Sequence, residues 1–115
     1  MSTSMPRVFV TQEITRINYA DAMDYGDVVF LTSDEYKPEP TDGRMNATIK
    51  HDIGKKMVDY IPGVDYILTS GSPVSIMVTG MIIGSQHARV NNGPRGVHRV
   101  LKWNNQSSRY DLCLI

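Results

Sequence analysis

The chain has few of the sequence features, such as several cysteines, a strong net charge or a long apolar segment, that assign a small protein to a class. Its 115 residues contain one cysteine, Cys113, so no internal disulfide can form, and this fits a reducing compartment. The formal net charge is zero, which argues against general attraction to nucleic acid or an anionic membrane. The amino-terminal MSTSMPR lacks the apolar core of a signal peptide, and the apolar segment 73–84 is too short to span a bilayer. We expect one α/β domain over residues 1–115, in the cytoplasm.

Catalytic and metal-binding patterns are missing as well. The sequence has no GxGxxG or GxxxxGK[ST] phosphate loop and no G-x-S-x-G nucleophile elbow. The spacing of His51, His87 and His98 does not resemble a metal site. Cys113 falls inside a predicted terminal strand, where we expect it to belong to the core. The sequence therefore favours a protein that is not an enzyme and that needs no cofactor and no metal.

Acidic residues are absent from a long part of the chain. Residues 1–65 hold eleven of the twelve acidic residues and residues 66–110 hold none. The same stretch carries Arg89, Arg95, Arg99, Lys102 and Arg109. Two interpretations stay open: a solvated rim balanced by acids elsewhere in the fold, or a surface for an anionic partner. In the second, Arg89, Lys102 and Arg109 are the expected partner contacts.

Short runs of β-branched and aromatic residues predict five strands. They cover Arg7–Val10, Asp27–Leu31, Asp65–Ser70, Val97–Trp103 and Arg109–Ile115. A short polar turn joins the last two, which predicts an antiparallel hairpin, and we expect Trp103 to be buried on the sheet near Leu101 and Tyr110. Residues 1–6 are expected to be a loose tail, and residues 34–45, rich in Pro and acids, a surface loop.

The helix predicted over Asn46–Tyr60 is amphipathic. Its apolar residues recur every three or four positions and form one stripe: Ile49, Ile53, Met57, Tyr60 and Ile61. Asn46 is the expected N-terminal cap. A shorter and poorly periodic helix is expected over Tyr19–Tyr25.

The helix predicted over Pro73–Gln86 differs, because apolar side chains occupy most of its circumference. Ser72 is the expected cap, and Pro73 suits the first helical position. A helix that is apolar all round is buried, either inside the domain or under a second subunit. Gly80 and Gly84 make a groove where another backbone can approach closely, either the sheet of the same chain or a second copy.

The order of elements is β, weak α, β, α, β, α, β, β. Such alternation predicts right-handed crossovers and a mostly parallel sheet. We therefore predict a compact three-layer α/β sandwich with strand order 2-1-3-4-5 and a C-terminal antiparallel hairpin.

Ligands of open α/β sheets bind beyond the carboxyl ends of the strands. Hydroxyl and glycine residues occupy those ends here: Thr11, Thr32, Ser70, Gly71 and Ser72. The last three precede a helix, where free N–H groups favour a nucleotide or other anion, with Arg95 or Arg99 as the opposing charge. The alternative is that this turn only caps the helix.

Three stretches carry a family resemblance: VFVTQ at 8–12, GSP at 71–73, and VLKW at 100–103 followed by a tyrosine-containing strand. Together they resemble a group of small proteins encoded by tailed bacteriophages. The resemblance implies phage origin and action in the cytoplasm of the bacterial host.

Three functions from different classes follow. The first is a non-enzymatic binding protein, a homodimer that contacts a host or phage protein. The alternative is a small-molecule binding protein that uses the strand–SGSP–helix turn. The further alternative is nucleic-acid binding through the basic 87–109 surface, against which the zero net charge argues.

Overall fold

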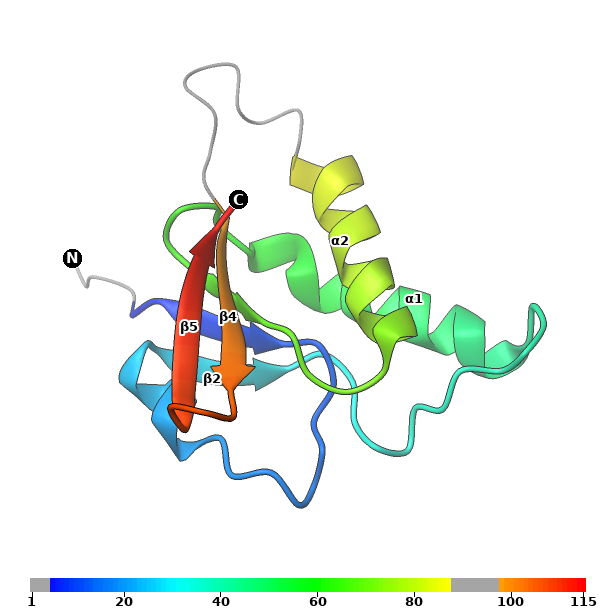
Figure 1. The fold of residues 1–115 in the computed structure, drawn as a ribbon. Helices are drawn as coiled ribbons and strands as arrows, with labels where there is room; N and C mark the ends of the chain where they lie inside the picture. The colour runs from blue at the N-terminus through cyan, green and yellow to red at the C-terminus, as the bar shows by residue number, and fades with distance from the viewer. Residues whose placement is uncertain (1–4, 88–97) are drawn as a thin grey trace.

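The computed structural model describes residues 5–87 and 98–115. Its strands are β1 (Arg7–Val10), β2 (Asp27–Phe30), β3 (Tyr66–Leu68), β4 (Arg99–Asn104) and β5 (Arg109–Leu114). Its helices are α1 (Arg44–Lys56) and α2 (Pro73–His87), with the short 3-10 segments η1 (Ala20–Asp24) and η2 (Met57–Asp59) (Figure 1). Every element predicted within these residues is present, with ends that differ by a few positions.

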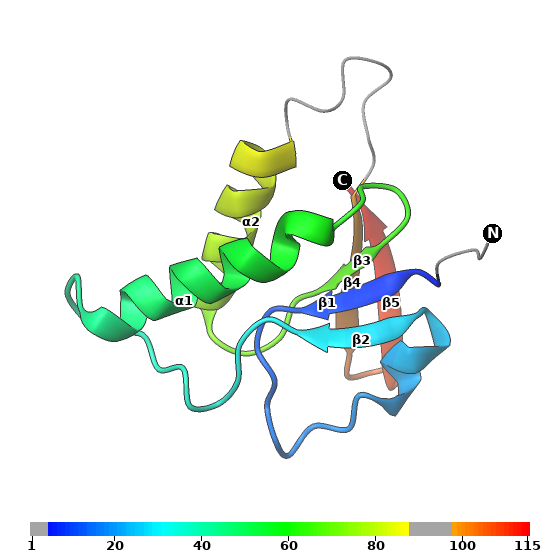
Figure 2. The ribbon, with the colours of Figure 1, turned by 180° about the vertical axis from the view of Figure 1, so that it is seen from behind.

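The five strands form one sheet in the order β2-β1-β3-β4-β5. β1 pairs in parallel with both β2 and β3, β3 pairs in parallel with β4, and β4 pairs antiparallel with β5 (Figure 2). The predicted fold class, strand order and terminal hairpin are therefore confirmed. Because β1, β3 and β4 run in the same direction, their carboxyl ends meet at one edge of the sheet.

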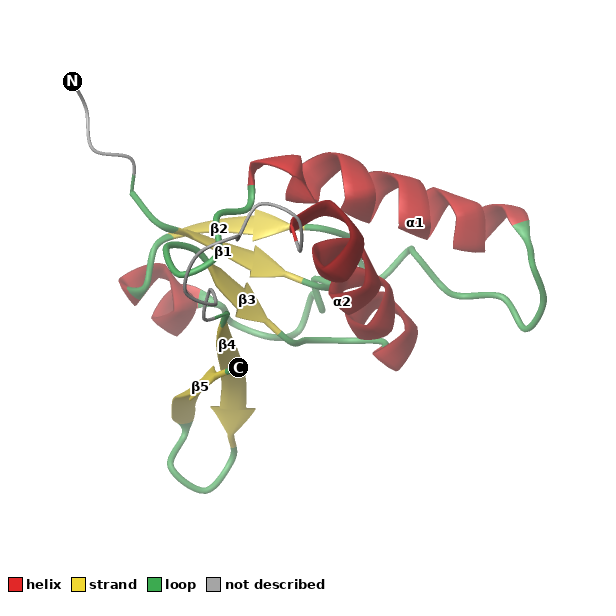
Figure 3. Ribbon diagram, turned by 90° about the horizontal axis from the view of Figure 1, so that it is seen from above, coloured by secondary structure: helices red, strands yellow, loops and turns green. Residues whose placement is uncertain are grey.

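Both long helices cover the same face of the sheet (Figure 3). The stripe predicted on α1 packs there, and its members Ile49, Ile53 and Met57 are buried together with Tyr60 against Phe9 of β1. Ile61, which was expected to join them, is exposed because the chain turns away after η2. From α2, the side chains of Val78, Ile82 and Ile83 complete this core.

The opposite face of the sheet has a thinner cover. Tyr19 and Ala22 of the η1 region pack there on the alternate residues of β1, Val8 and Val10. Leu68, Leu101 and Tyr110 extend the cluster across β3, β4 and β5. The helix predicted over Tyr19–Tyr25 is thus a single 3-10 segment, which makes the third layer of the sandwich much slighter than the layer of α1 and α2.

The terminal hairpin is less covered than the sequence predicts. Trp103 is 41% exposed, although its ring makes the expected contact with Tyr110 at 5.0 Å between centroids. Cys113 is exposed rather than part of the core. In Figure 3, β4 and β5 extend away from α1 and α2, so these two helices leave the hairpin largely uncovered on their side of the sheet.

Two expectations about helix details are also wrong. Gly43, not Asn46, is the N-cap of α1, and the Asn46 side chain instead holds the preceding loop by accepting from the N–H of Glu39 and donating to its carbonyl. Gly80 and Gly84 do not pack against the sheet, since a Cβ at either position would meet nothing within 4 Å among the residues that the structure describes. The glycine groove of α2 therefore faces outward. No helix in the described part of the chain is long and apolar enough to cross a membrane.

Candidate functional site

The hydroxyl residues at the carboxyl ends of the strands lie together, as the sequence predicts, but they bind one another. The Thr11 hydroxyl donates to the Ser70 carbonyl at 2.6 Å and accepts from the Ser70 N–H at 2.9 Å. The Thr32 hydroxyl donates to the Thr11 carbonyl at 2.8 Å. Thr11 and Thr32 are both buried. These side chains therefore tie β1, β2 and β3 together at this edge of the sheet.

Gln12 closes the turn before α2. Its Oε1 accepts from the Ser72 N–H at 2.5 Å, and its Nε2 donates to the Ser33 carbonyl at 3.0 Å. Gly71 has φ +80°, and a Cβ there would lie 2.2 Å from that same Oε1, so both the backbone and the space require glycine. Gln12 ends the VFVTQ stretch singled out in the sequence, but its hydrogen bonds to the turn could not be predicted, because they depend on the pairing of β1 with β3.

Ser72 caps α2 as predicted, since its Oγ accepts from the Val74 N–H at 3.1 Å. The N–H groups of Ser70, Ser72 and Val74 thus all have protein acceptors. An anion at this turn would have to displace them. The cap interpretation agrees with these contacts, and the anion site stays a prediction.

Arg99 does not approach this turn. It begins β4 beside Tyr66, the first residue of β3, and therefore lies at the opposite edge of the sheet. Its guanidinium stacks on the Tyr66 ring at 4.0 Å from the centroid and donates to the Val64 carbonyl. Arg95, the other candidate for the opposing charge, lies outside the described residues.

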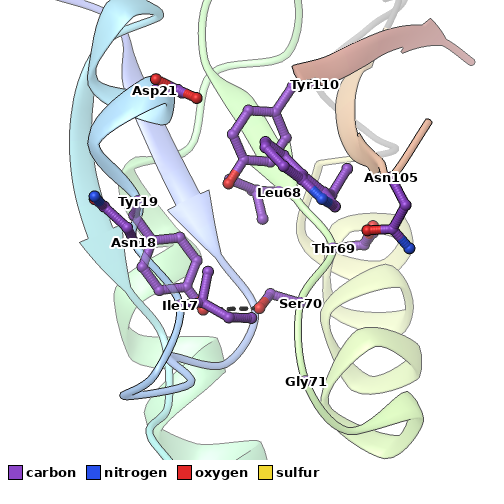
Figure 4. Close-up of a pocket in the computed structure, with 11 residues that line it drawn as sticks. Ile17, Asn18, Tyr19, Asp21, Leu68, Thr69, Ser70, Gly71, Asn105 and Tyr110 are labelled. Carbon is purple, nitrogen blue, oxygen red and sulfur yellow. Dashed lines mark hydrogen bonds between the residues drawn. The ribbon is translucent and has the colours of Figure 1, made fainter. Parts of the chain in front are cut away.

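A cavity of about 550 Å³ opens beside the turn, on the face covered by η1 (Figure 4). It is lined from three sides: the β1–η1 connection and η1 (Ile17, Asn18, Tyr19, Asp21), the end of β3 and its turn (Leu68, Thr69, Ser70, Gly71), and the terminal hairpin (Trp103, Asn105, Tyr110). The Tyr19 hydroxyl lies 2.9 Å from the Ser70 Oγ and accepts from the Ile14 N–H at 2.9 Å, which fixes that ring in the wall.

Negative charge and aromatic rings characterise this cavity. Among the described residues that line it, none is a lysine, arginine or histidine, and Asp21 is the one carboxylate. Burial raises the pKa of Tyr110, with smaller contributions from Tyr19 and Asp21. The sequence could have indicated Tyr110 and Trp103 by their strand alternation. It gave no signal for Asp21, because residues 13–27 show no clear period.

Exposed apolar side chains mark two further surfaces. On α2, Val74, Met77 and Met81 are 44–66% exposed, and Met77, Gly80 and Met81 line an apolar groove there. We call these residues, with Gly84, the outer face of α2. On the hairpin, Leu112 and Leu114 are exposed on β5, the edge strand of the sheet.

The predicted partner contacts on the hairpin are accessible. Lys102 and Arg109 are both exposed, and Arg89 lies outside the described residues. Lys102 stands opposite Asp111 on β5, so a carboxylate partly offsets the cationic surface expected there. Within residues 5–87 and 98–115, no group of His, Cys, Asp or Glu side chains is arranged to hold a metal ion.

Comparison with known families places the chain among phage proteins. Residues 6–114 match the family described as Phage Pam3 gp32-like protein, and the chain belongs to this family. The match confirms the phage family expected from the resemblance of the three short stretches. Neither a curated protein nor a solved structure gives a match.

Proposed function

We propose that this phage protein is a non-enzymatic binding protein that forms a homodimer through the outer face of α2 and contacts a phage or host protein in the host cytoplasm. The observation that carries the proposal is the apolar character of that face. Met77 and Met81 are 66% and 63% exposed, and Pro73–His87 contains no Asp, Glu, Lys or Arg. Exposed apolar patches of this kind commonly mark interaction sites.

A second copy of the chain is the occupant that fits this face. In a two-fold dimer the same surface meets itself, so any charge on it would lie near its own copy. The outer face of α2 carries none. Its residues at 74, 77, 81 and 84 follow the three- and four-residue spacing that forms a narrow seam between paired helices. A Cβ added at Gly80 or Gly84 would meet no atom of residues 5–87 and 98–115 within 4 Å beyond the helix itself, so the described part of the chain leaves room for another helix.

The terminal hairpin would carry the contact with the second protein. β5 is an edge strand, with one row of backbone N–H and C=O groups available for strand addition. Exposed Leu112 and Leu114 lie on one side of it, and the cations Lys102 and Arg109 lie nearby. Affinity capture from infected cells tests this part: Leu114→Glu should lose a protein that the unaltered chain retains, and equal capture by both would contradict it.

Light scattering at micromolar protein tests the dimer. We expect about twice 12.9 kDa for the unaltered chain and 12.9 kDa for Met77→Glu, because the dimer would bury two like charges against each other. Met23→Glu is the matched control, since Met23 is 64% exposed on η1, away from α2, and this variant should remain dimeric. Circular dichroism checks that both variants fold. A mass of 12.9 kDa for the unaltered chain at all concentrations would contradict the dimer.

A further inference from the structure

The cavity between η1, the end of β3 and the terminal hairpin has a lining that selects for positive charge. We propose that it binds a small organic cation of the alkylammonium class, held between aromatic rings and the Asp21 carboxylate (Figure 4). The proposal concerns a different surface from the outer face of α2, and it holds or fails independently of dimer formation.

Two aromatic rings form one wall of the cavity. Trp103 and Tyr110 pack edge to face, with centroids 5.0 Å apart and planes at 73°. This arrangement does not stack the two ring faces on each other, and Trp103 stays 41% exposed at the cavity. The face of an aromatic ring carries partial negative charge, and Trp is the best side chain for attracting a cation in this way. A cation in the cavity would thus lie against ring surface that is otherwise exposed to water.

The charged groups of the lining also favour a cation. Within residues 5–87 and 98–115, the Asp21 carboxylate takes part in no hydrogen bond and no ion pair. With no cationic side chain in the described lining, an anionic ligand would find no opposite charge and would lie near this carboxylate and the negative ring faces. A neutral ligand would leave Asp21 unused. Asp21 is also among the causes of the raised pKa of Tyr110, after burial and Tyr19.

The size and the remaining polar groups restrict the ligand further. The cavity measures about 550 Å³, within the range of sites for small molecules. The Thr69 hydroxyl and the Asn105 amide also line it, and neither side chain is engaged in a hydrogen bond within the described parts of the chain. A short alkylammonium that carries a hydroxyl group would therefore match the ring faces, the carboxylate and these two polar groups at once.

Choline and its neutral isostere 3,3-dimethyl-1-butanol provide the test, because they share shape and hydroxyl and differ only in charge. Trp103 is the single tryptophan of the chain, so its fluorescence reports occupation of the cavity directly. We expect choline to give a saturable change and to bind about 5- to 30-fold more tightly than the isostere. Equal binding of the two compounds, no saturable change with either, or tighter binding of adenosine than of choline would overturn the proposal.

Matched variants locate the site. Asp21→Asn removes the charge and keeps the shape, and it should weaken choline binding about threefold to fivefold while leaving the isostere unchanged. Asp24→Asn is the control, since Asp24 is also exposed on η1 but does not line the cavity. It should bind choline as the unaltered chain does. An equal loss in both variants, or a loss in neither, would show that Asp21 does not hold the cation and would overturn the proposal.

Discussion

The two long helices cover the same face of the sheet, yet their outward surfaces differ in kind. α1 buries Ile49 and Ile53 and turns Lys50 and Lys55 to solvent, which is the ordinary division of an amphipathic helix. α2 buries its inner side on the same core but leaves its outer face apolar and without charge. Contacts within this one chain therefore cover the apolar side of α1, whereas α2 has the composition of a helix covered on two sides.

This comparison shows what hydrophobic periodicity measures. A stripe of apolar residues reveals which side of a helix is covered. A helix that is apolar all round reveals only that more than one of its sides is covered. Neither pattern says whether the cover comes from the same chain. Changes on the two helices should consequently act on different quantities: folding stability for α1, and association for the outer face of α2.

The largest effect on stability should come from the buried stripe of α1. Ile53 is fully buried, so Ile53→Ala should lower the free energy of unfolding by about 2–5 kcal/mol through lost contacts and the cavity it leaves. Val58→Ala, at an exposed position in the following segment η2, should change it by less than about 0.5 kcal/mol. Urea unfolding measures both. Similar values for the two variants would contradict the assignment of α1 to the core of this chain.

A smaller effect on the free energy of unfolding should appear at alkaline pH, from Tyr60 in the core beneath α1. Burial raises the pKa of Tyr60 from 10.0 to about 12. The folded chain then keeps the phenolic proton where the unfolded chain loses it. The contribution of this group to stability is complete below pH 10 and is lost as pH rises towards 12, by about 3 kcal/mol in all. Unfolding measured at several pH values should show this decline, and Tyr60→Phe should flatten it. An identical decline in that variant would assign it to other groups.

The smallest effect should come from the start of α2. Ser72 caps this helix, whereas Gly43 gives α1 no side-chain cap. Ser72→Ala should therefore lower the free energy of unfolding by about 0.5–2 kcal/mol, and with it the thermal midpoint. Ser85→Ala, near the other end of α2, should have little effect, because Ala favours a helix at least as well as Ser.

Most of the fold could be predicted because its signals are local. The run at Arg7–Val10, the stripe of α1 and the Ser72–Pro73 start of α2 each depend on a few neighbouring residues, and the alternation of strands and helices then restricts the topology. The errors concern what packs over an element. Trp103 and Cys113 alternate correctly on their strands, but no periodicity reveals that these two positions of the hairpin stay exposed.

The candidate site could be predicted only in part. Thr11, Thr32 and Ser70 were expected to meet at the carboxyl ends of the strands, and they do. Their mutual hydrogen bonds depend on register between strands far apart in the chain, which the sequence does not encode locally. The cavity depends even more on such distant pairing, because it brings Asp21 of η1 opposite residues of the hairpin.

The hairpin also equips the chain for spectroscopy without any substitution. Its single tryptophan, Trp103, and its single cysteine, Cys113, stand on the paired strands β4 and β5. Cys113 is exposed and alternates with Tyr110 and Leu112, so a maleimide dye would attach on the sheet face opposite the cavity. Energy transfer between indole and dye would report the integrity of the hairpin, and transfer between dyes on two chains would report their assembly, in the unaltered protein.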